Sequence, residues 1–108
     1  MANLIITPDA KSDILRFYNF YLETANEKVA FAMFDTITNK INELSKNPYL
    51  GRSYFNEETQ LHYREFLIFF GKARRNCYIA LYDFDGETVT VLRIKNARES
   101  GYRPIPIV

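Results

Sequence analysis

The spacing of apolar residues changes at Asn47-Pro48, and this change constrains the fold more than any other feature of the sequence. Before it, apolar side chains recur every three or four residues, which is typical of amphipathic helices. After it, aromatic and β-branched residues stand in short continuous runs, which are typical of strands. Because the residue before a proline is disfavoured in a helix, Asn47 should end the helical part. We therefore expect the helices to precede most of the strands.

The first part of the chain predicts one strand and two helices. Residues 4–6 form a short apolar run, and residues 7–9 then supply a capping threonine, a proline at the first helical position and an acid in the first turn. The first helix should end near Glu23, and the second should follow residues 24–26 and run to Asn47. So short a connection predicts that the two helices lie antiparallel as a hairpin.

The second part of the chain predicts three antiparallel strands. They are expected at residues 61–70, 75–84 and 88–95, where aromatic and β-branched residues are frequent. Gly71-Lys72 separates the first two, and Asp85-Gly86, a common hairpin dipeptide, separates the last two.

The remaining segments are expected to be irregular. Residues 49–60 are predicted as a polar connection, and residues 96–108 as a turn followed by an extended tail. The resulting order is strand, helix, helix, strand, strand, strand. It defines an α+β fold in which the helix hairpin packs on one face of a mostly antiparallel sheet and leaves the other face partly open.

Length and composition predict a single domain spanning residues 1–108. With 108 residues and 47% hydrophobic content, the chain has enough apolar surface for one core. The single cysteine, Cys77, excludes an internal disulfide and a cysteine-rich zinc site, so we expect no metal and no cofactor. No basic stretch precedes an apolar run at the start, and no long uncharged apolar segment occurs, so a cytoplasmic protein without a membrane partner is expected.

Charge is unevenly distributed along the chain although its sum is only +1. Residues 1–60 contain six basic and eight acidic side chains, whereas residues 61–108 contain eight and five. Positive charge therefore gathers in the strand-rich part, where an acidic partner would be attracted.

Short motifs follow one another in a fixed order. Residues 6–10 read Ile-Thr-Pro-Asp-Ala, and Asp13-Ile14 follows them. The helix exit carries Asn47-Pro48 and Gly51-Arg52. The later motifs are Tyr63-Arg64 and residues 78–82, 91–94 and 96–99. In order and spacing they resemble the RelE/ParE superfamily of toxins from bacterial type II toxin-antitoxin pairs, from residue 6 to residue 102.

This resemblance implies one of two activities. Members similar to RelE cut messenger RNA on the ribosome with basic, acidic and phenolic side chains, and members similar to ParE poison DNA gyrase. Arg64, Arg98 and Tyr102 match positions of the cleaving set. Phe66 and Ile79, however, stand where cleaving members carry a lysine and an arginine, and neither can stabilise a phosphate transition state. We therefore favour the ParE-like, plasmid-stabilisation branch.

Three hypotheses follow. The first is a gyrase inhibitor neutralised by a cognate antitoxin protein. The second is a ribosome-dependent messenger-RNA endonuclease that uses Arg64, Arg98 and Tyr102 as candidate catalytic residues. The third is an inactive scaffold that only binds an antitoxin. A homodimer or a toxin-antitoxin hetero-oligomer is compatible with each.

Basic residues are the first candidates for binding the antitoxin or the target. In the last predicted strand, Arg93 and Lys95 share a face with Val89 and Val91, and a cationic pair on such an apolar face is unusual. Further candidates are Arg64 and the hairpin cluster of Lys72, Arg74 and Arg75, although a charged hairpin tip is more often only solvated.

The two helices carry more aromatic residues than one small core requires. We expect a groove on the hairpin, lined by Leu15, Phe17, Phe20, Phe31 and Phe34. An amphipathic helix, a strand, or both, from the antitoxin should lie along it and pair acids with Arg93 and Lys95.

Overall fold

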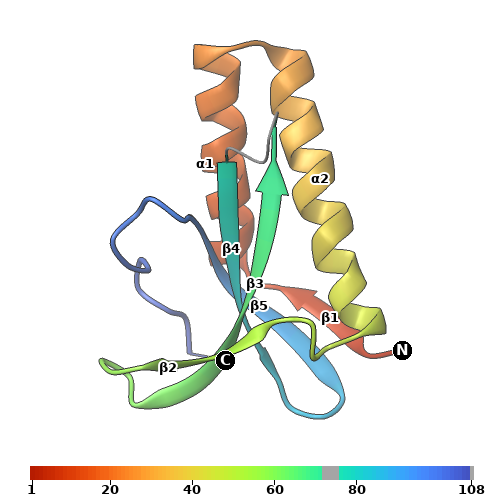
Figure 1. The fold of residues 1–108 in the computed structure, drawn as a ribbon, viewed down its shortest axis with the longest axis vertical. Helices are drawn as coiled ribbons and strands as arrows, with labels where there is room; N and C mark the ends of the chain where they lie inside the picture. Colours follow the sequence, from red (N-terminus) through yellow and green to blue (C-terminus); the bar gives the residue numbers. More distant parts are fainter. Residues whose placement is uncertain (72–75, 108) are drawn as a thin grey trace.

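The computed structural model describes residues 1–71 and 76–107, in two helices and five strands (Figure 1). In chain order they are β1 (Asn3–Ile6), α1 (Pro8–Thr24), α2 (Glu27–Lys46), β2 (Arg52–Asn56), β3 (Leu61–Phe70), β4 (Asn76–Phe84) and β5 (Thr88–Asn96).

The strands form one mixed sheet in the order β1-β5-β4-β3-β2. Only the β1–β5 pair is parallel, and the other three pairs are antiparallel. The helices run side by side as a hairpin across one face, with α1 against β5 and α2 against β3 (Figure 1). The predicted α+β fold is confirmed, and the sheet has one strand more than the sequence indicated.

Side chains just outside each helix explain where the helices begin. The Thr7 hydroxyl accepts a hydrogen bond from the Ala10 N–H at 3.1 Å and donates to the Leu92 carbonyl at 3.0 Å. Asn26 caps α2 by accepting from the Val29 N–H at 2.9 Å. Each cap satisfies an N–H group that lacks a partner within the helix. The threonine also joins the start of α1 to β5.

The additional strand is β2, which lies within the predicted connection at residues 49–60. It pairs with Leu61–Glu65 of β3, from Asn56↔Leu61 to Arg52↔Glu65. The prediction of a polar connection is therefore wrong for this segment. A five-residue edge strand is stabilised by its neighbour rather than by its own hydrophobic pattern, which explains why the sequence did not indicate it.

Gly51 lets the chain approach the sheet closely just before β2. A Cβ atom here would lie 2.6 Å from Cε1 of Tyr82 and 2.8 Å from the Glu65 carbonyl oxygen. The Gly51 N–H donates to the Tyr82 hydroxyl at 2.9 Å, and that hydroxyl donates to the Pro48 carbonyl at 2.7 Å. Tyr82 thereby fixes the exit from α2, and only glycine fits beside it.

The core lies between the helix hairpin and the sheet. Fully buried side chains from α2 meet buried side chains from β3, β4 and β5, and Ile14 and Phe17 add the contribution of α1. The largest of them are Met33, Ile37, Ile41, Leu44, Ile68, Tyr78, Tyr82, Val89, Val91 and Ile94. Burial of each such side chain stabilises the fold by roughly 1.5–3 kcal/mol, before the entropy of ordering is subtracted.

A β-bulge in β5 reverses which residues face the helices. Tyr82 pairs with Val91 but its neighbour Leu81 pairs with Arg93, so Leu92 is the additional residue. Val89 and Val91 consequently point into the core, whereas Arg93 and Lys95 lie on the opposite face. The predicted shared face is therefore wrong, because a simple alternation does not continue through a bulge.

The second face of the sheet is partly covered by the chain that follows β5. Residues 97–107 form turns and extended chain and return along the sheet toward β2 (Figure 1). Leu81 and Leu92, which do not belong to the helix-side core, are nonetheless almost fully buried.

Candidate partner-binding site

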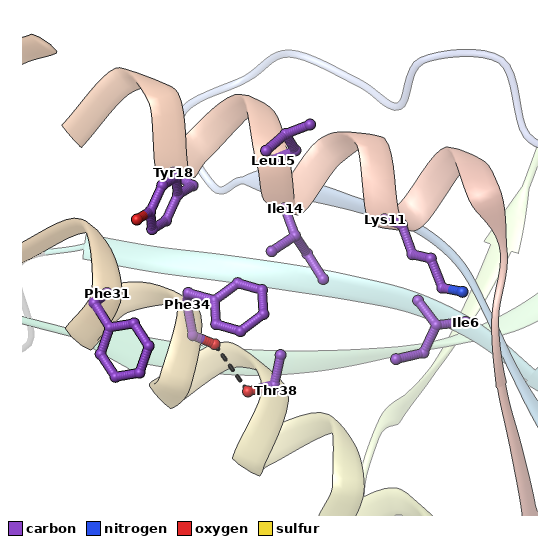
Figure 2. A pocket seen from close by; sticks show the side chains of 8 residues that line it. All are labelled: Ile6, Lys11, Ile14, Leu15, Tyr18, Phe31, Phe34 and Thr38. Atoms are coloured by element: carbon purple, nitrogen blue, oxygen red, sulfur yellow. Dashed lines mark hydrogen bonds between the residues drawn. The ribbon is translucent and has the colours of Figure 1, made fainter. Parts of the chain in front are cut away.

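An apolar groove of about 600 Å³ lies between α1 and α2 on the helix hairpin (Figure 2). Its lining residues are Ile6, Lys11, Ile14, Leu15, Tyr18, Phe31, Phe34 and Thr38. The volume is within the range of sites that bind ligands or side chains of a partner.

The groove arises because each helix has more apolar residues than its core-facing side accommodates. In α2, Met33 and Ile37 point into the core, while Phe31 and Phe34 lie on the groove wall. The side chain of Phe31 is 61% exposed and that of Leu15 is 57% exposed. Large apolar side chains exposed together mark a site of interaction more often than an ordinary surface.

Aromatic contacts hold the walls of the groove in place. The rings of Tyr18 and Phe34 meet edge to face across the helices, with centroids 6.3 Å apart. Phe31 and Phe34 are 6.5 Å apart along α2. The groove is thus built on two rigid helices, which lowers the entropy lost when a partner binds.

Polar groups in the groove are few and are placed at its margins. Lys11 extends toward Ile6 at one end, while Tyr18 and Phe31 lie at the other (Figure 2). The Thr38 hydroxyl already donates to the Phe34 carbonyl at 2.9 Å. Within the described residues, Lys11 has no ion-pair partner. The groove therefore fits an apolar segment that carries an acid at one end.

The residues that line the groove are only partly those expected from the sequence. Leu15, Phe31 and Phe34 line it as expected. Phe17 is buried in the core against Tyr78, with ring centroids 4.8 Å apart, and Phe20 lies on another side of α1. Ile14, Tyr18 and Lys11 also line the groove, although they were not among the residues expected there. Their spacing with Leu15 was the available signal that they share a site.

The Arg93 side chain has a structural role, because it binds groups of the chain itself. Its Nε and Nη2 atoms donate to the two carboxylate oxygens of Asp13 at 3.0 and 2.6 Å, and Nη1 donates to the Pro104 carbonyl at 3.2 Å. The residue is only 8% exposed. The prediction that Arg93 contacts an acidic partner conflicts with this geometry, because an acid of the chain itself occupies that position.

Lys95 and Tyr102 belong to a cluster that fastens the tail to the second face. The Lys95 ammonium lies 4.5 Å from the centroid of the Tyr102 ring. The Tyr102 hydroxyl donates to Glu65 Oε2 at 2.5 Å, and Arg52 Nε donates to Oε1 of the same carboxylate at 3.2 Å. Burial, followed by the hydrogen bond and charge of Glu65, raises the pKa of Tyr102 far above its usual value.

The three candidate catalytic residues are not brought together. Arg64 pairs with Tyr82 on the helix side, where its Nη1 donates to the Gly51 carbonyl at 2.6 Å and its guanidinium lies over Tyr49. Tyr102 binds Glu65 on the other face. Arg98 is exposed in the turn after β5. Phe66 packs against the core, and Ile79 is buried.

Two further observations concern the described residues 1–71 and 76–107. They contain no group of three histidine, cysteine, aspartate or glutamate side chains arranged to hold a metal ion. They also contain no helix long and apolar enough to cross a membrane. The candidates Lys72, Arg74 and Arg75 lie outside the described residues.

A mixed sheet beneath a helix hairpin, with an apolar groove between the helices, defines a small α+β protein with a surface suited to binding a partner. The model of the family described as ParE toxin of type II toxin-antitoxin system, parDE, matches residues 4–101. The chain therefore belongs to the ParE toxin family, which confirms the resemblance inferred from its motifs.

A solved structure supports the fold. The structure described as the chromosomal ParDE TA system from P. aeruginosa is similar to this chain with a TM-score of 0.70 at 20% sequence identity. The match covers 89% of this chain and 96% of that chain. None of the curated proteins matches the sequence.

Proposed function

We propose that this toxin arrests growth by inhibiting DNA gyrase and is neutralised by a cognate antitoxin whose amphipathic segment lies in the groove between α1 and α2. The observation that carries the proposal is the groove, in a chain that belongs to the ParE toxin family. Because gyrase acts in the cytoplasm, the toxin that inhibits it is cytoplasmic as well. The toxin and the antitoxin form a hetero-oligomer.

The groove supports an antitoxin helix on chemical grounds. An amphipathic helix presents apolar side chains every three or four residues, and such a stripe complements a trough lined by Leu15, Phe31 and Phe34. An acidic residue near one end would pair with Lys11. The match of shape and charge supports a helical segment rather than a small molecule.

Gyrase is favoured over messenger-RNA cleavage because two of the three candidate cleaving residues, Arg64 and Tyr102, already bind other groups of the chain. A general acid must release its proton readily, whereas the raised pKa of Tyr102 opposes this. Arg64 holds the backbone at Gly51, and buried Ile79 cannot bind a phosphate. These contacts support an activity that needs a binding surface rather than acid-base chemistry.

A supercoiling assay with purified gyrase tests the proposed target. We expect the toxin in excess to block supercoiling, and the antitoxin to restore it. Unimpaired supercoiling would exclude gyrase. Primer extension on translating ribosomes is the companion measurement, because cuts inside the A-site codon would establish the endonuclease instead. Normal growth after induction without antitoxin would indicate an inactive scaffold.

A further inference from the structure

The groove continues into two neighbouring hollows on the outside of α1. The first, of about 440 Å³, is lined by Ser12, Leu15, Arg16, Asn19, Phe20 and Glu23. It shares Leu15 with the groove. The second, of about 380 Å³, shares Arg16 and Phe20 with the first and reaches Asn96 and Arg98 after β5. The three hollows are therefore adjacent.

The order of these residues around the helix makes the hollows one path. Successive residues of an α-helix are rotated by about 100°, so Leu15 and Phe20 lie about 140° apart around α1, with the polar residues Ser12, Arg16, Asn19 and Glu23 between them. Figure 2 shows Ile14 pointing into the groove and Leu15 on the outer side of the helix. Phe20, farther around, is 56% exposed. Two large apolar side chains thus stand on either side of a polar strip of α1 that the route crosses.

Charges at the two ends distinguish this route from an ordinary apolar surface. Lys11 stands at the groove end, and Arg98 stands at the far end. Glu99, which follows Arg98 in the sequence, binds Arg16 Nη1 at 3.2 Å. The Arg98 N–H donates to Asn96 Oδ1 at 3.0 Å, which holds the turn. In the described part of the chain, the Arg98 side chain has no ion pair.

We propose that the antitoxin does not end in the groove but crosses α1 as an extended chain over Leu15 and Phe20 and places a carboxylate on Arg98. This inference rests on the proposed function, because the extended segment continues from the antitoxin helix that is proposed to lie in the groove. The crossing segment is extended because a straight helix does not bend around another helix. A helix is about 10–12 Å wide, so the crossing takes on the order of six residues at about 3.3 Å each.

The antitoxin is favoured over a second copy of the chain as the occupant because of continuity and charge. The path begins inside the groove, and a single segment can follow it from end to end. Lys11 and Arg98 are cations at the two ends of the path, so acidic side chains of the occupant would pair with them. A second copy could offer only its extended tail, residues 103–107, which is apolar but carries Arg103 and no acidic side chain to pair with Lys11 or Arg98.

The test is calorimetric binding to the protein encoded by the reading frame adjacent to that of the toxin, separated from the toxin and then titrated back. Phe20→Ser and Arg98→Glu should each weaken binding about tenfold, whereas Arg98→Lys should bind close to the parent. Phe31→Ser tests the groove itself. Arg103→Glu, at an exposed site outside the three hollows, is the matched charge control and should bind like the parent.

Each outcome decides between the two proposals. If Phe31→Ser weakens binding but Phe20→Ser and Arg98→Glu do not, the crossing is wrong and the groove proposal stands. If none of the three weakens binding, both surfaces are wrong. No binding by the parent rejects both. A concentration-dependent dimer of the free chain that Phe20→Ser and Arg98→Glu abolish, with binding unchanged, would assign the path to a second copy. Thermal melting confirms that each variant is folded.

Discussion

Asp13 in α1 accepts three hydrogen bonds from β5, two from the Arg93 guanidinium at 2.6 and 3.0 Å and one from the Ile94 N–H at 2.9 Å. The partners are 80 or more residues apart in sequence. β1 pairs with β5 only as far as Val91, so beyond this point Asp13 takes the place of a neighbouring strand. Arg93 also binds the Pro104 carbonyl. One carboxylate therefore orders α1, β5 and the tail together.

We expect Asp13→Asn to destabilise the protein by about 3–5 kcal/mol, because it removes the carboxylate that binds the buried Arg93 guanidinium at 2.6 Å and leaves only Asp9, at 3.7 Å, as a counterion. Urea unfolding of the isolated toxin measures the change. Asp9→Asn is the control, since the Asp9 side chain is half-exposed and lies 3.7 Å from Arg93, and it should cost less than about 1 kcal/mol. Equal effects from the two substitutions would contradict the assigned role of Asp13.

Gly51→Ala should destabilise the fold by about 1–3 kcal/mol. The added Cβ would overlap the Tyr82 ring and the Glu65 carbonyl, and the latter is backbone that cannot easily move. Gly101→Ala is the matched control, because a Cβ there meets nothing within 4 Å. Thermal melting of both variants measures the difference. If Gly51→Ala melts with the parent, the chain before β2 is not held as closely to Tyr82 as described.

The sequence predicted those parts of the fold that depend on local signals. Thr7 and Pro8 mark the start of α1, Pro48 follows the end of α2, and Asp85-Gly86 makes the β4–β5 turn. In that turn, N–H groups of Thr88 and Glu87 bind the Asp85 carboxylate and lower its pKa. Each of these signals involves residues that are close together in the chain, so it can be recognised from the sequence alone.

The sequence did not predict what depends on distant partners. The strand β2 exists because β3 pairs with it, and the bulge at Leu92 moves Arg93 away from the face expected for it. The ion pair between Asp13 and Arg93 joins residues 80 positions apart. Part of the groove was foreseen because Leu15, Phe31 and Phe34 exceed what one core needs, but Phe17 packs inward once α1 meets Tyr78.

Stability should fall at alkaline pH because the pKa of Tyr102 is raised in the folded state. Its usual value is near 10, so above pH 10 the unfolded chain loses this proton while the folded chain keeps it. The folded state then binds more protons, and stability decreases as pH rises. Below pH 10 the Tyr102 phenol is neutral in both states, so its full contribution to the stability of the fold is present.

Urea unfolding at pH 9, 10 and 11 tests this expectation. The parent should lose stability over this interval, and Tyr102→Phe, which has no proton to release, should lose less. At neutral pH the same substitution should cost about 1–3 kcal/mol, because Glu65 loses a hydrogen-bond donor while it remains buried. Parallel pH profiles for parent and variant would show that Tyr102 is not the group responsible.

Phe34→Ala should weaken antitoxin binding more than Lys95→Ala does. Phe34 lies on the wall of the groove between α1 and α2, and truncation of an aromatic anchor that a partner buries typically costs about 2 kcal/mol or more. Lys95 stacks on Tyr102 on the opposite face of the sheet, so its loss should change binding by less than about 1 kcal/mol. Calorimetry on both variants, each shown by melting to be folded, measures the difference. If Lys95→Ala has the larger effect, the antitoxin binds the second face of the sheet and the groove serves another partner.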